Sequence, residues 1–173
     1  MSVIKGRKYN FVFKNVRLPN GRTARLEMVQ HPGAVLIVPF LSATKIILLR
    51  QYRPTFKEYL YELPAGTLEK GEQPLPCAKR ELMEETGFAA KRIRRLGHIY
   101  LVPGYSDEVI HIFAATDLYR QAAIPDEDEI IEAQVFTRRH VQTLFRCRRI
   151  IDAKTICALA FCGWIPAKPR SAG

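Results

Sequence analysis

The stretch that decides the fold is Gly66–Phe88, which reads GTLEKGEQPLPCAKRELMEETGF. Its spacing of apolar residues differs from the strand-like alternation that precedes it. Pro74 and Pro76 stand where a helix can begin, and Gly87 stands where a helix ends. The stretch therefore predicts an amphipathic helix of about three turns over residues 75–87. One face of this helix is expected to be buried through Leu75, Ala78 and Leu82.

Three glutamates of this helix, Glu81, Glu84 and Glu85, fall close together. At about 100° per residue they lie within an arc of about 100°, so one helix face presents them together. Arg80 is the basic residue at i,i+4 spacing, and it faces Glu84. Carboxylates grouped without His or Cys favour a hard divalent cation, Mg²⁺ or Mn²⁺.

Strand patterns occupy the chain on both sides of this helix. Before it, strands are expected around 11–16, 24–29, 34–38, 45–50 and 58–63. After it, strands are expected at 99–102, 109–114 and 130–136, followed by a helix over 152–161 with Asp152 as its N-cap. Because strands and helices do not alternate regularly, the sequence predicts the α+β class.

Composition narrows the class of protein. The chain has 173 residues, 47% of them hydrophobic, and this length typically forms one domain. Its apolar runs are shorter than the roughly 20 residues that span a bilayer, so no membrane association is expected. The four cysteines show no CxxC or paired-His spacing, which favours free thiols in the cytoplasm over a zinc site.

The net charge of +10 indicates an anionic ligand. Basic residues collect in Lys91–Arg95 and Arg138–Arg149, which also suits two solvated surfaces. No nucleic-acid-binding motif accompanies them, so a nucleic-acid partner is not expected. A polyanionic small ligand such as a nucleotide fits the charge better.

The residues of the quoted stretch resemble the Nudix hydrolase box at every defined position. The matching spacing is Gly66-x5-Glu72-x7-Arg80-Glu81-Leu82-x-Glu84-Glu85-x-Gly87-Phe88. The resemblance implies an α/β/α sandwich around a mixed sheet. It also implies hydrolysis of a nucleoside diphosphate linked to another group.

The same resemblance implies a role for each residue of the box. Glu81 and Glu85 match the principal metal-ligand positions, and Glu84 matches a further acidic position that ligates directly or through water. Structural or orienting roles fall to Gly66, Glu72, Arg80 and Gly87.

Segments outside the box resemble ADP-ribose and related nucleotide-sugar pyrophosphatases. They are Arg50–Arg53, Glu62–Gly66 and Pro103, which stands sixteen residues after Gly87. In this subgroup the backbone carbonyl at the position of Ala65 completes the metal shell. Taken alone, the Pro103-Gly104 pair is equally typical of a simple turn.

The resemblance also implies how substrate is bound and attacked. Arg53 is expected to bind phosphate, and Glu108 to hydrogen-bond a ribose hydroxyl. The catalytic base is expected in the acidic run 126–129, with Glu127 as first choice and Glu129 as second choice or added metal ligand. From the residues alone, Arg53 also suits an ordinary surface position and the acidic run a solvated loop.

The expected reaction is metal-dependent hydrolysis of ADP-ribose or another ADP-sugar to AMP and a sugar phosphate. The alternative substrate is GDP-mannose or a broad range of nucleoside diphosphate sugars. A non-catalytic nucleotide-sugar sensor is disfavoured because the box is intact.

Residues 1–42 are expected to form a β-rich dimerisation region of a homodimer, and residues 43–173 the catalytic domain. The aromatic residue that stacks on the base is left open among Tyr9, Phe11, Phe13 and Phe40.

Overall fold

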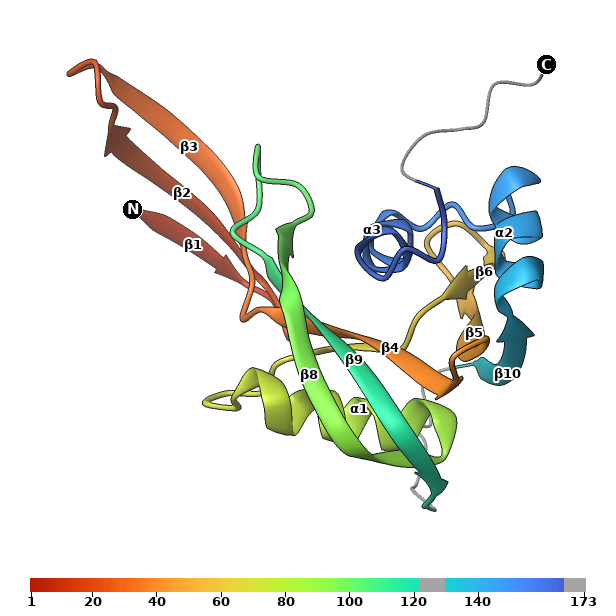
Figure 1. The fold of residues 1–173 in the computed structure, drawn as a ribbon. Coiled ribbons are helices and arrows are strands. Elements are labelled where there is room, and N and C mark those ends of the chain that lie inside the picture. The colour runs from red at the N-terminus through yellow and green to blue at the C-terminus, as the bar shows by residue number, and fades with distance from the viewer. Residues whose placement is uncertain (122–129, 167–173) are drawn as a thin grey trace.

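The computed structural model describes residues 1–121 and 130–166 of the chain. Within them the strands form two sheets (Figure 1). The smaller, antiparallel sheet has the order β1-β2-β3, formed by β1 (Ser2–Lys5), β2 (Asn10–Arg17) and β3 (Thr23–Gln30).

The larger sheet has seven strands and the order β10-β5-β4-β9-β8, with β6 added beside β5 and β7 beside β4. Its strands are β4 (Ala34–Ser42), β5 (Lys45–Arg53), β6 (Glu58–Glu62), β7 (Ala65–Thr67), β8 (Phe88–Tyr100), β9 (Val109–Arg120) and β10 (Ile131–Thr137). The helices are α1 (Pro74–Thr86), α2 (Arg138–Arg146) and α3 (Ala153–Phe161). Because β4 and β9 run parallel and the other pairs antiparallel, the sheet is mixed.

The hydrophobic core lies on both faces of β4, whose residues 34–38 are all buried. On one face, Val35 and Ile37 pack with Cys77 and Leu82 of α1. On the other face, Leu36 and Val38 belong to the cluster that includes residues of α2 and α3. A strand covered on both faces is expected to be apolar without alternation, as β4 is. Helices on both faces of a mixed sheet confirm the α+β class and the expected layers (Figure 1).

The helix α1 forms as its end signals predict. Prolines occupy its first turn, where a missing N–H costs no hydrogen bond. Gly87 ends it in the left-handed region at φ 69°, and its N–H donates to the Met83 carbonyl at 2.8 Å. The expectation for Leu75 is wrong, because its side chain is 41% exposed in the first turn. Cys77 takes that place on the buried face beside Ala78 and Leu82.

Two elements differ from the sequence prediction: β8 is longer than the expected strand, and α2 was not among the expected helices. β8 begins at Phe88, directly after Gly87, and includes the basic run 91–95. β8 is the last strand in the sheet order, and the charged side chains of this run are exposed to solvent. The second basic run contains α2, whose first turn is capped by the Thr137 side chain accepting from the His140 N–H.

The two sheets divide between Gln30 and Ala34, because β4 lies within the larger sheet and not with β1–β3. The sequence places the domain division after residue 42, and that division stays a prediction. Among the described residues, no helix is long and apolar enough to cross a membrane.

Candidate active site

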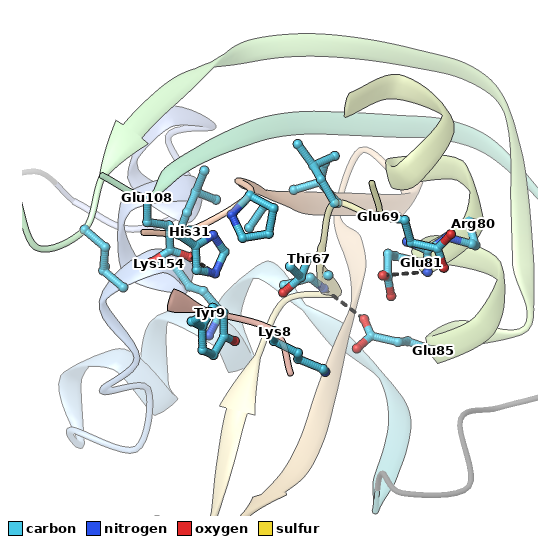
Figure 2. Close-up of a pocket in the computed structure, with 18 of the residues that line it drawn as sticks. Lys8, Tyr9, His31, Thr67, Glu69, Arg80, Glu81, Glu85, Glu108 and Lys154 are labelled. Carbon is cyan, nitrogen blue, oxygen red and sulfur yellow. Dashed lines mark hydrogen bonds and ion pairs between the residues drawn. The ribbon is translucent and has the colours of Figure 1, made fainter. Parts of the chain in front are cut away.

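A cavity of about 840 Å³ lies where α1, β7, α3 and the turn between β1 and β2 meet (Figure 2). Most of the predicted site residues line it, although they come from distant parts of the sequence. They are Arg53, Ala65, Gly66, Arg80, Glu81, Glu84, Glu85 and Glu108. Glu72 and Gly87 are not among the lining residues. Glu127 and Glu129 lie outside the described residues.

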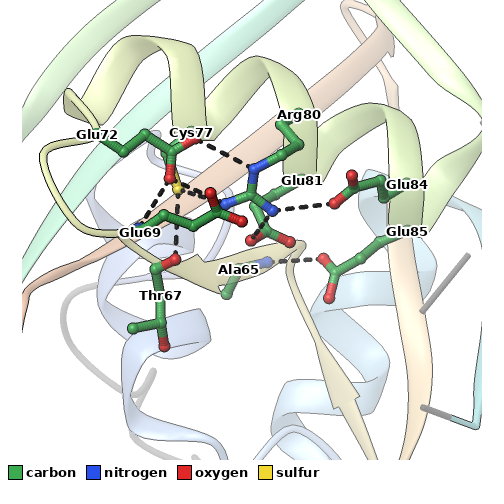
Figure 3. Close-up of polar contacts among 9 residues, drawn as sticks. All are labelled: Ala65, Thr67, Glu69, Glu72, Cys77, Arg80, Glu81, Glu84 and Glu85. Atoms are coloured by element: carbon green, nitrogen blue, oxygen red, sulfur yellow. Dashed lines mark hydrogen bonds and ion pairs between the residues drawn. The ribbon is translucent and has the colours of Figure 1, made fainter. Parts of the chain in front are cut away.

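Arg80 is the centre of an ion network along α1 (Figure 3). Its Nε and Nη2 donate to the two oxygens of Glu72 at 3.1 and 3.0 Å. Its Nη1 donates to Glu81 at 2.7 Å and to Glu84 at 3.0 Å. The hydrogen bond from Arg80 holds the pKa of Glu72 below its ordinary value, and the glutamates raise the pKa of Arg80. One cation thus faces three carboxylates, which leaves a surplus of negative charge on this wall.

Gly66 is required by a close approach. A Cβ added there would lie 1.7 Å from Oε1 of Glu81, so only glycine lets this carboxylate rest against the β7 backbone. Glu85 is held at the same strand, because its Oε2 accepts the Ala65 N–H at 2.8 Å. The strand β7 and the helix α1 therefore fix two glutamates at one end of the cavity.

A second ion network lies on the wall formed by β5, β6 and α3. Glu62 is 1% exposed and accepts two hydrogen bonds from the Arg53 guanidinium, each at 2.7 Å. Lys154 donates to the same carboxylate and to Asp152. Burial raises the pKa of Glu62, but Arg53 and Lys154 outweigh burial and hold the pKa below its ordinary value. Sequence reasoning assigned no role to Glu62 or Lys154 individually, because no local pattern links residues this far apart.

The family model of the NUDIX domain matches residues 30–159. The chain belongs to the Nudix family. Nudix hydrolases generally depend on a divalent metal ion, and the glutamates of the cavity are the residues whose chemistry could meet that requirement.

Curated relatives of this Nudix chain include proteins of different names. It is 37% identical over 161 residues to the ADP-ribose pyrophosphatase of Bacillus subtilis (strain 168), covering 92% of this chain and 87% of that protein. The identity and coverage are the same for the methanol dehydrogenase activator of Bacillus methanolicus. The GDP-mannose pyrophosphatase of Yersinia enterocolitica is 33% identical over 138 residues, covering 75% of this chain and 72% of that protein.

A solved structure of an ADP compounds hydrolase superposes on this Nudix chain with a TM-score of 0.80. The two sequences are 26% identical, and the match covers 94% of this chain and 89% of the other. The similarity therefore extends over both sheets and is not confined to the box.

The donors on α1 fit a hard divalent cation by their chemistry. Glu81, Glu84 and Glu85 offer only carboxylate oxygens, and Gly66 leaves room for Glu81 beside the β7 backbone. In residues 1–121 and 130–166, no three His, Cys, Asp or Glu side chains are yet arranged to hold a metal ion. Arg80 lies between Glu81 and Glu84, so ligation requires these carboxylates to turn from Arg80 toward the cation.

Glu108 is held at the far end of the cavity by a histidine that sequence reasoning missed. His31 Nδ1 accepts the Gly33 N–H at 2.9 Å, so Nε2 carries the proton of the neutral ring and points to Glu108 at 3.5 Å. Tyr9 stacks on His31 with ring centroids 4.8 Å apart. Of the four aromatic residues considered for base stacking, Tyr9 alone is among the lining residues.

Proposed function

We propose that this chain hydrolyses the pyrophosphate bond of ADP-ribose or another ADP-sugar, giving AMP and a sugar phosphate. The observation that carries the proposal is the pairing of two walls in one cavity. The α1 wall presents carboxylates for a cation, and the opposite wall presents Arg53 and Lys154. The similarity to ADP-ribose pyrophosphatases supports the choice of substrate.

Glu81 and Glu85 would hold the divalent cation, Mg²⁺ in our proposal and Mn²⁺ as an alternative, together with the Ala65 carbonyl and Glu84. When bound, such a cation would supply positive charge for the pyrophosphate and a lowered pKa for a water molecule. Arg53 attracts a phosphate through the positive charge of its guanidinium, and Glu108 accepts a hydrogen bond from a ribose hydroxyl. Tyr9 stacks on the base.

We propose Glu127 as the general base, with Glu129 as second choice or further ligand. The support is the resemblance, which assigns the base to the acidic run 126–129. General-base catalysis is worth about 10²–10⁴ in rate, so Glu127→Gln should lose turnover while the Mg²⁺ concentration for half-activation stays unchanged. If Glu129→Gln alone abolishes turnover, the two roles are exchanged.

We propose a homodimer in which the N-terminal sheet joins two copies. The support is a group of exposed apolar side chains on β1 and β2, Val3, Ile4 and Phe11. Light scattering at micromolar concentration should give twice the chain mass. An active monomer would contradict this proposal.

The substrate is tested by incubating the pure protein with Mg²⁺ and a panel of nucleotide sugars and separating the products. ADP-ribose should give AMP, and excess chelator should stop the reaction. GDP-mannose is the second candidate, supported by the GDP-mannose pyrophosphatase relative. A protein that binds these compounds without cleaving any of them would be a sensor.

The location of the chain in the cell is a separate proposal. The four free cysteines support a reducing, cytoplasmic location.

A further inference from the structure

Glu62 is a buried carboxylate shared by two cations, one from the preceding strand and one from a distant helix. Arg53 is on β5, and Lys154 is in the first turn of α3, 92 residues after Glu62. Both cations line the cavity, and Lys154 lies at the opposite end from Arg80 and Glu85 (Figure 2). The Arg53 side chain is still 34% exposed and lines the cavity, so a ligand bound there would lie close to its charge.

We propose that Lys154 is a positioning residue that shares the neutralisation of Glu62 with Arg53 and so maintains the positive potential that attracts the phosphates of the substrate to this wall. This inference rests on the proposed function. A buried carboxylate must be compensated by nearby cations. Without Lys154, the negative charge of Glu62 would be compensated by one cation fewer, and this wall would attract phosphate less strongly.

The first turn of α3 holds Lys154 in place. Asp152 caps the helix by accepting the Thr155 N–H at 3.0 Å, and it also accepts from Lys154 Nζ at 2.9 Å. Thr155 Oγ1 accepts the Leu63 N–H at 2.9 Å, which fastens the helix to the residue that follows Glu62. Lys154 is therefore preorganised, and little side-chain entropy is lost when substrate binds.

The charges of this network predict two effects of opposite sign. Arg53, Glu62, Lys154 and Asp152 together balance in charge. Lys154→Met leaves the group with a net negative charge, which should weaken phosphate binding. Asp152→Asn leaves it with a net positive charge and keeps an N-cap acceptor, so it should strengthen phosphate binding without disturbing the helix.

The test is isothermal titration of ADP into the full chain with excess chelator, which separates binding from catalysis. Lys154→Met should weaken ADP binding about tenfold, and Asp152→Asn should tighten it about threefold, as expected for charges in a poorly solvated site. Lys91→Met, an exposed lysine on β8 that does not line the cavity, is the matched control and should bind ADP as the native chain does.

A double variant separates charge from packing. Glu62→Gln combined with Lys154→Met removes one charge of each sign, so ADP affinity should return to within about threefold of native. A packing role for Lys154 would instead make the double variant at least as weak as the single one. If Lys154→Met does not fold, as judged by circular dichroism, Asp152→Asn still tests the sign of the effect.

Steady-state kinetics place the effect on binding: Lys154→Met should raise KM for ADP-ribose about tenfold with a smaller change in kcat. Unchanged ADP affinity in both Lys154→Met and Asp152→Asn overturns the inference, as does weakening in both. If the native chain cleaves nucleotide sugars and Lys154→Met does so with the same KM, this inference fails alone. A native chain that neither cleaves nucleotide sugars nor binds ADP overturns the inference and the proposed function together.

Discussion

The two ion networks that face each other across the cavity use the same kinds of residue in different proportions. Along α1 and the loop before it, one arginine is shared by three glutamates, and the carboxylates are in surplus. On the wall formed by β5, β6 and α3, one buried glutamate is shared by an arginine and a lysine, and Asp152 brings this network to charge balance. The first arrangement suits a cation, and the second, with two cations at the cavity, suits an anion. The difference explains how one cavity can hold both a divalent metal ion and a pyrophosphate.

The networks also differ in how the chain builds them. Arg80 and its partners lie within one helix and the loop that precedes it, so local folding brings them together. Glu62 and Lys154 meet only when α3 packs against the end of β6. The α1 network is therefore fixed by local structure, and the β6–α3 network depends on tertiary packing.

The strongest way to break the carboxylate wall is Glu85→Gln, which keeps the shape and removes the charge. Turnover of ADP-ribose should fall by about 10² or more, because stabilisation by a bound cation is worth several kcal/mol. Glu58→Gln, an exposed glutamate on β6, should retain native turnover. Mg²⁺-dependent activity measured on both variants checks this. Native turnover in Glu85→Gln would refute its assignment as a metal ligand.

The same wall can be disturbed from the backbone by Gly66→Ala. The new methyl group would occupy the place of the Glu81 carboxylate, which a Cβ would approach to 1.7 Å. If Glu81 is a metal ligand as proposed, displacing it should raise the Mg²⁺ concentration for half-activation about tenfold or more, by analogy with disturbed ligand positions in other metal sites. Gly104→Ala, where a Cβ meets nothing within 4 Å, should leave metal activation unchanged.

The sequence predicts the parts of the site that local structure forms, and it does not predict the parts that form by tertiary packing. The box helix, its C-terminal glycine and the glutamate face can be predicted because their spacing is local, and the box shows the family. Local pattern cannot reveal that His31 supports Glu108, or that Lys154 reaches Glu62, because each contact forms between distant segments. Leu75 has the spacing of the buried face but lies in the first turn of α1, where Cys77 is buried instead, and spacing alone does not reveal which turn of a helix is covered.

The packing that builds the second wall can be tested at Thr155, whose hydroxyl accepts the buried Leu63 N–H. Thr155→Val keeps the volume and leaves that N–H without its acceptor, which should lower the free energy of unfolding by about 1–3 kcal/mol. Thr155→Ser keeps the hydroxyl and should cost less than Thr155→Val. Urea unfolding of the three proteins measures the difference. A Thr155→Val variant as stable as the native chain would contradict this role of the hydroxyl.

The smallest effect is expected at Glu72, which binds Arg80 without lining the cavity. Because Arg80 lowers the pKa of Glu72 in the folded chain, this carboxylate stabilises the fold fully above the unfolded value of 4.5. Its contribution is lost as the pH falls from 4.5 through the lower folded pKa. Glu72→Gln keeps one acceptor oxygen, so it should lower the free energy of unfolding by about 1 kcal/mol at pH 7, and this loss should shrink below pH 4.5.

Glu132→Gln, which removes an exposed ion pair with Arg50, is the matched control and should change the free energy of unfolding little at either pH. Urea unfolding at pH 7 and at pH 3.5 tests both variants, and a cost for Glu72→Gln that grows at low pH would contradict the assigned role of Arg80.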